Sequence, residues 1–158
     1  MRDDVVTPAT ARRLTSAGLG WEPGVGDWCA VFGAAHTVET ASSLWLVVGI
    51  TTSGALTIAD ASGQWPLTRV SAGDCGWLPT AGQLKTWLRA RGYRVATGET
   101  VVAYLGSLTP SPRFVCRLSR GVPAVQEDYD GPSEAEAVAA AVLHVLSAQN
   151  PGISSGGW

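Results

Sequence analysis

The sequence is poor in charged residues, lysine, histidine and cysteine, and each shortage excludes a class of protein. Only 15% of the 158 residues are charged, the formal net charge is -2, and ten of the eleven basic residues are arginine. Such a chain has no strong positive field to attract a phosphate backbone or an anionic lipid surface. We therefore expect neither nucleic acid nor membrane as its partner.

The cysteine pattern argues against both disulfide bonds and a structural zinc site. Cys29, Cys75 and Cys116 are odd in number, lie far apart and form no CxxC pair. This pattern favours neither a disulfide framework nor a zinc site. We expect three small, buried thiols in a reducing compartment, and no metal or cofactor.

Long apolar runs and a signal-peptide pattern are also missing, so we expect a soluble, cytoplasmic protein. A chain of 158 residues is long enough to bury roughly two-thirds of its unfolded surface, and a hydrophobic content of 46% favours a well-filled core over disorder. We expect a single α+β domain over residues 1–158, or two sub-units at 7–92 and 93–149. Residues 150–158 are expected to form a flexible tail.

The clearest element is a helix that starts at Thr80. Thr80 is a good N-cap, and Gln83 three residues later completes a capping box. Leu84 and Leu88 follow at helical spacing, and Gly92 can adopt the left-handed conformation that ends a helix. The apolar stripe of this helix needs a partner surface, which must come from strands on either side.

Two further helices are predicted. Thr7 followed by proline opens a helix over residues 8–17, which Gly18 stops. Ser133 and Glu136 are expected to form a second capping box at the start of a helix over residues 133–149. Its buried stripe should contain Val138, Val142, Val145 and Leu146.

Apolar runs between turn residues predict the strands. The expected strands cover residues 28–33, 43–51, 55–60, 65–70, 93–97, 100–105, 114–118 and 124–128. The resulting order, α-β-β-β-β-α-β-β-β-β-α, separates helices from blocks of strands and favours an α+β fold with antiparallel sheets. The unbroken apolar run at 44–48 predicts a central strand covered on both faces. Pro66 should place the strand at 65–70 on an edge.

Three motifs carry a family resemblance. They are W-x-P-x-x-G-D-W from Trp21, W-L-P-T-x-x-Q-L from Trp77, and G-P-S-x-A-E-A from Gly131. In this order they resemble motifs of small uncharacterised α+β proteins of phages, prophages and other bacterial mobile elements. The resemblance implies an accessory role, such as binding a host protein or a small signalling molecule, and it transfers no catalytic residue.

Histidine and the acidic residues offer little catalytic chemistry. His36 is a weak candidate for a general base, but no nucleophile motif accompanies it. His144 lies one position from the buried stripe of the last helix and is expected to be structural. Residues 127–130, EDYD, are read as a solvated acidic turn rather than a cation site, because the calcium-loop pattern is missing.

The candidate binding residues are aromatic and basic. Tryptophan is a favoured interface anchor, and arginine pairs carboxylates and phosphates. The candidates are Trp65, Trp77, Lys85, Arg89, Arg91 and Arg94. The basic cluster could equally just complement the end of the helix that starts at Thr80.

We expect a non-enzymatic binding protein for a protein partner or a small anionic ligand, and a homodimer, because few charges and many tryptophans suit a self-complementary interface. A nucleotide-like small-molecule sponge and a small hydrolase that uses His36 are the alternatives.

Overall fold

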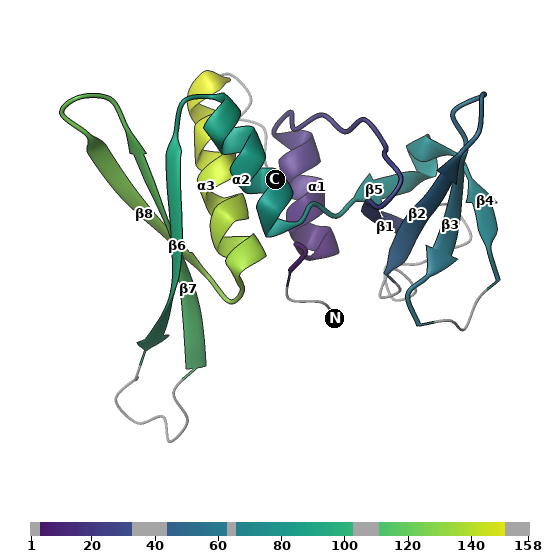
Figure 1. The fold of residues 1–158 in the computed structure, drawn as a ribbon, viewed down its shortest axis with the longest axis horizontal. Coiled ribbons are helices and arrows are strands. Elements are labelled where there is room, and N and C mark those ends of the chain that lie inside the picture. Colours follow the sequence, from purple (N-terminus) through teal and green to yellow (C-terminus); the bar gives the residue numbers. More distant parts are fainter. Residues whose placement is uncertain (1–3, 33–43, 63–65, 103–110, 151–158) are drawn as a thin grey trace.

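The computed structural model describes residues 4–32, 44–62, 66–102 and 111–150. It has the expected α+β fold, built from helices and two antiparallel sheets (Figure 1). The helices are α1 (Pro8–Ser16), α2 (Ala81–Ala90) and α3 (Glu134–Gln149), with a 3-10 turn η2 (Ala72–Asp74). The strands are β1 (Trp28–Val31), β2 (Trp45–Ile50), β3 (Leu56–Asp60), β4 (Thr68–Val70), β5 (Cys75–Trp77), β6 (Arg94–Val102), β7 (Ser111–Arg120) and β8 (Val125–Gly131).

The first sheet has the strand order β4-β3-β2-β1-β5. One of its faces buries a small core of Cys29, Val31, Trp45, Val47, Leu56 and Ile58. The central position of β2 and the edge position of β4, just after Pro66, are confirmed. Burial of β2 on both faces was wrong, because Val48 is 39% exposed and Ile50 is 43% exposed. The apolar run is therefore a one-sided strand.

The second sheet has the order β6-β7-β8, and α2 and α3 cover one of its faces (Figure 1). The turn expected at Gly98-Glu99 is absent. Gly98 pairs with Val115 and Glu99 with Phe114 inside one continuous antiparallel ladder. The long partner strand β7 supplies these pairs, so the turn propensity of a Gly-Glu step is overridden.

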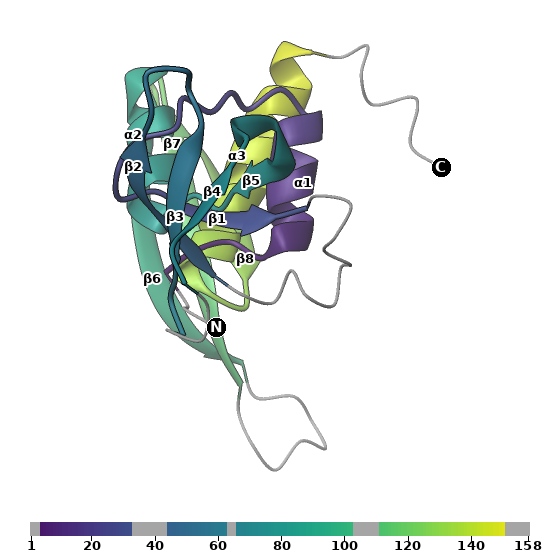
Figure 2. The ribbon, with the colours of Figure 1, turned by 90° about the vertical axis from the view of Figure 1, so that its right-hand side faces the viewer.

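Helix α3 is buried on most of its surface because it lies between the second sheet, α1 and α2 (Figures 1 and 2). All four residues of the predicted stripe are buried, together with alanines that allow close approach. Gly131, the last residue of β8, meets the first turn of α3. A Cβ atom at Gly131 would lie 2.6 Å from the backbone nitrogen of Ala137 and 2.9 Å from the carbonyl carbon of Glu136.

The second capping box is half formed. The Ser133 side chain accepts a hydrogen bond from the backbone N–H of Glu136, as expected. The Glu136 carboxylate does not accept the reciprocal hydrogen bond from the backbone N–H of Ser133. It accepts from the backbone N–H of Thr7 at 2.7 Å and from the Thr10 hydroxyl at 2.6 Å. The acid thus caps α1, because α1 packs against α3 and presents two donors that need an acceptor.

Helix α2 has the predicted capping box between Thr80 and Gln83, and Gly92 adopts a φ of 86° just past its end. The Gln83 amide also donates to Asp27 Oδ1 at 2.7 Å. Asp27 Oδ2 in turn accepts from the Trp21 indole at 2.9 Å. This chain of hydrogen bonds ties α2 to the turn that leads into β1. No helix in the described ranges is long and apolar enough to cross a membrane.

Candidate functional site

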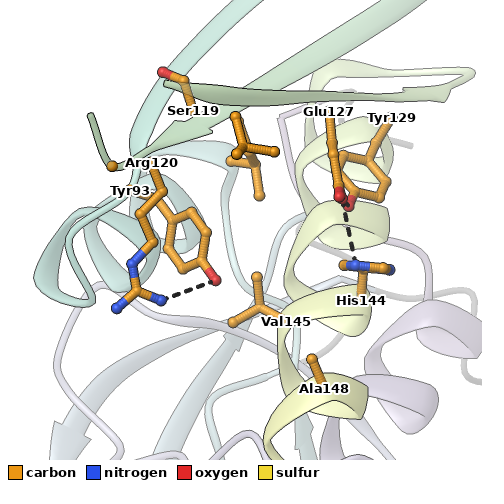
Figure 3. Close-up of a pocket in the computed structure, with 11 residues that line it drawn as sticks. Tyr93, Ser119, Arg120, Glu127, Tyr129, His144, Val145 and Ala148 are labelled. Carbon is orange, nitrogen blue, oxygen red and sulfur yellow. Dashed lines mark hydrogen bonds and ion pairs between the residues drawn. The ribbon is translucent and has the colours of Figure 1, made fainter. Parts of the chain in front are cut away.

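A groove opens between the turn end of the β7–β8 hairpin and the second half of α3 (Figure 3). The register places Leu118 opposite Glu127 and Cys116 opposite Tyr129. Because directly paired residues of a sheet share a face, all four side chains project toward α3. Leu118, Glu127 and Tyr129 line a cavity of about 410 Å³ between this face of the sheet and the helix. That volume lies in the range of small-molecule sites.

The floor of the groove is apolar. Leu118 and Val145 are only 3% and 2% exposed, and Ala148 continues the helical wall beyond them. Val125, on the opposite wall, is 67% exposed, and Val122 in the neighbouring hairpin turn is 99% exposed. An apolar surface of this kind favours an occupant that removes it from water.

An acidic and aromatic cluster closes one side of the groove. His144 Nε2 lies 3.3 Å from Glu127 Oε2, and the Tyr129 hydroxyl donates a hydrogen bond to the same carboxylate oxygen. The Tyr129 and His144 rings lie 5.4 Å apart between centroids. Burial, and then the hydrogen bond to Glu127, raise the pKa of the Tyr129 phenol. Tyr129 therefore stays protonated and acts as a donor.

A basic and aromatic pair closes the other side (Figure 3). The Arg120 guanidinium donates a long hydrogen bond, 3.5 Å, to the Tyr93 hydroxyl, and its central carbon lies 5.1 Å from the centroid of the Tyr93 ring. A guanidinium has five N–H donors. Most of the Arg120 donors have no acceptor among the described residues, so Arg120 can bind an anion at the mouth of the groove.

The groove contains His144, a residue type that can act as a general base. Nucleophilic catalysis by His144 would need a hydroxyl or thiol within hydrogen-bond reach. Ser119 lines the cavity, but its hydroxyl points away from His144 (Figure 3). Within the described ranges His144 makes no hydrogen bond to a serine, threonine or cysteine. His36, the weak catalytic candidate, lies outside the described residues.

A second cavity, of about 370 Å³, lies between α1 and β5, which are neighbours in Figures 1 and 2. Trp77, one of the predicted binding residues, lines it and stacks on Trp21 with the rings 6.4 Å apart and nearly parallel. Its indole Nε1 is buried and has no acceptor in the described part of the chain. Arg12 lies 4.4 Å above the Phe32 ring at the same cavity. Trp65, another predicted binding residue, lies outside the described residues.

Two members of the predicted basic cluster are engaged within the chain. Lys85 forms an ion pair with Glu134 at the start of α3, and the Arg91 guanidinium lies 3.5 Å above the Trp87 ring. Arg89 and Arg94 are exposed. None of these four side chains lines either cavity.

The Lys85–Glu134 pair gives a pH-dependent prediction. Hydrogen bonds from Lys85 first, and from Thr97 second, hold the pKa of Glu134 below its ordinary value of 4.5. A depressed pKa stabilises the fold above the unfolded value, and this contribution is lost as the pH falls through the folded value. Glu134→Gln should therefore be less stable than the wild type at neutral pH and nearly equal to it in strong acid. Urea unfolding at both pH values measures this, and Lys85→Met should behave in the same way. A stability difference that persists unchanged in acid would contradict the assignment.

The acidic segment EDYD is part of β8, not a turn. Asp128 pairs with Arg117 on the outer face of the sheet, with Nε to Oδ1 at 2.7 Å, and Asp130 pairs with Arg113. Glu127 and Tyr129 face the groove instead. Alternation of faces along a strand separates the acids, and the described residues contain no cluster of His, Cys, Asp or Glu that could hold a metal ion.

The residues that line the groove were not predicted as site residues. His144 was expected to be structural, and Glu127 was assigned to a solvated turn. The available signal was the spacing of Glu127 and Tyr129, two positions apart, which places both on one face of a strand. The sequence offered no means of knowing that α3 would present His144 to that face.

No protein-family model, no curated protein and no solved structure matches this chain.

Proposed function

We propose that this protein is a non-enzymatic binding protein that holds a small amphipathic anion, with an aromatic body and one acidic group, in the groove between β7–β8 and α3. The observation that carries the proposal is the placement of Arg120, with donors to spare, at the mouth of an apolar cavity. Tyr93 and Tyr129 supply aromatic walls for the ligand body.

The charges of the groove favour an anion over a cation. The Glu127 carboxylate already accepts from Tyr129 and lies beside His144. Among the residues that the structure describes, Arg120 contacts Tyr93 alone, through a long hydrogen bond and the face of its ring. A ligand acid group would therefore gain charge-assisted hydrogen bonds at Arg120, whereas a cation at Glu127 would compete with two existing partners.

Fluorescence titration with anilinonaphthalene sulfonate, an apolar aromatic anion, tests the proposal. The wild type should bind the dye saturably. Arg120→Gln should weaken binding about tenfold or more, because a charge-assisted pair is worth about 1.5–3 kcal/mol. Ala148→Trp should abolish binding by filling the cavity from the exposed side of α3.

Two matched controls locate the site. Arg89→Gln removes an exposed arginine outside both cavities and should leave the affinity unchanged. Arg12→Gln tests the second cavity, which also has an arginine beside aromatic rings. Equal affinity in wild type, Arg120→Gln and Ala148→Trp would overturn the proposal. So would a loss of binding in Arg12→Gln alone.

A further inference from the structure

Two free thiols meet across neighbouring strands of the first sheet. In the antiparallel pairing of β1 with β5, Cys29 lies opposite Trp77 and Val31 lies opposite Cys75. Cys29 and Cys75 are therefore diagonal neighbours on one face of the sheet. Both are unbridged, Cys29 is completely buried, and Cys75 is partly exposed.

The two thiols differ in protonation. A hydrogen bond to Cys75, and then burial, raise the pKa of Cys29. The same hydrogen bond lowers the pKa of Cys75, although burial and the nearby Asp74 oppose it. Cys29 thus keeps its proton and donates it toward Cys75 Sγ. The more exposed sulfur has the greater thiolate character, which is the nucleophilic form of cysteine.

Cys75 is the member of the pair that lines the second cavity. It lies in the second cavity, between α1 and β5, with Arg12, Trp21, Phe32 and Trp77. The adjacent Gly76 leaves room for the Phe32 ring, because a Cβ atom there would lie 2.1 Å from Phe32 Cε2. Because Cys75 lines this cavity, a small electrophile can approach it from there, and Cys29 lies on the neighbouring strand.

We infer that Cys75 is a peroxide-reactive thiol and that Cys29 is its resolving partner. The Cys75 thiolate attacks one oxygen of a hydroperoxide, so that an S–O bond forms and the O–O bond breaks. The leaving oxygen takes a proton and departs as water or an alcohol. The Cys29 sulfur then attacks the Cys75 sulfenic acid, so that the S–S bond forms, the S–O bond breaks, and the Cys29 proton leaves with the hydroxyl as water. The two thiols lose two electrons and the peroxide gains them.

The geometry makes this bond a reversible one. The α-carbons of diagonal neighbours in an antiparallel sheet lie roughly 7–8 Å apart, at or beyond the upper limit for a disulfide. Closing the bond must draw β5 toward β1. As a three-residue edge strand, β5 pairs with one neighbouring strand, β1, and strain in the closed bond favours reduction. The movement carries Trp77, so its stacking on Trp21 should change with the redox state.

Hydrogen peroxide added to the full chain tests this inference. The intact mass should fall by two hydrogens, peptide mapping should find Cys29 linked to Cys75, and dithiothreitol should restore the mass and the tryptophan fluorescence. Cys116 is the internal control, because it is buried in the second sheet and burial raises its pKa to about 11. Iodoacetamide should label Cys75 at least tenfold faster than Cys116.

Single variants separate the two steps. Cys29→Ala keeps the buried position filled and should stop the reaction at the Cys75 sulfenic acid, which dimedone traps. Cys75→Ser should give neither adduct nor link. Labelling of Cys75 and Cys116 at equal rates, or a peroxide-treated wild type without the Cys29–Cys75 link, would overturn the inference even if neither variant folds.

Discussion

Gly131→Ala should lower the free energy of unfolding by about 3 kcal/mol, at the upper end of the usual cost of overpacking. The added methyl group would lie 2.6 Å from the backbone nitrogen of Ala137 and 2.9 Å from the carbonyl carbon of Glu136. Backbone atoms in the first turn of a buried helix cannot swing aside as a side chain can. The whole of α3 would have to shift away from β8. Urea denaturation measures the change.

Gly98→Ala is the matched control for this prediction. Gly98 also lies in a strand of the second sheet, but a Cβ atom there would meet nothing within 4 Å. Its replacement should be neutral or slightly stabilising, because alanine restricts the unfolded chain more than glycine does. Equal losses in the two variants would show that the close contact at Gly131 has no energetic role.

Glu136→Ala should also destabilise the protein by about 3 kcal/mol. The carboxylate accepts hydrogen bonds from the Thr7 backbone and from the buried Thr10 hydroxyl. Hydrogen bonds to a charged group contribute about 1.5–3 kcal/mol each, and the variant leaves both donors without their acceptor. Amide hydrogen exchange in the first turn of α1 should accelerate more than exchange in α2, because the hydrogen bonds that the Glu136 carboxylate accepts come from Thr7 and Thr10 at the start of α1.

Asp128→Asn provides the comparison for a carboxylate that is exposed. Asp128 is paired with Arg117 on the outer face of the second sheet, and both side chains are about half exposed. Exposed pairs of this kind contribute little to stability, so the variant should unfold close to the wild type. If Glu136→Ala were equally mild, the carboxylate would not be the cap that holds α1.

The helices were predictable because their signals are local. Thr80 and Gln83 lie three residues apart and satisfy each other's backbone groups wherever the helix packs. Glu136 shows the limit of this reasoning. The same three-residue spacing predicted a bond back to Ser133, but donors at Thr7 and Thr10 lie within reach once α1 packs on α3. Tertiary contacts decided between two acceptable partners.

The strands were harder to predict because turn signals compete with pairing. Gly98-Glu99 has the composition of a turn, yet both residues pair with the long strand β7, so β6 continues without a break. The short strand β5 was missed entirely, because three residues beside a 3-10 turn show no periodicity.

The groove could not be predicted from the sequence, because tertiary packing brings its residues together. Its residues come from the position just before β6, from the β7–β8 hairpin and from the last turns of α3, and the packing of α3 brings them together. Polar residues at 126–130 hide the alternation of faces that would have paired Glu127 with Tyr129. Lys85 illustrates the reverse error, since its partner Glu134 is 49 positions away in the chain. Arg91 lies four residues after its partner Trp87, a spacing that brings side chains together on a helix.

The capping of α1 by Glu136 has a consequence for biosynthesis. The two partners are 126 and 129 positions apart in the chain. A ribosome must therefore translate most of the sequence before the acceptor for Thr7 and Thr10 emerges from the exit tunnel. Until then α1, only nine residues long, is too short to be stable alone in water. We expect residues 8–16 to be synthesised early, to remain unstructured while the chain grows, and to become helical among the last elements to fold.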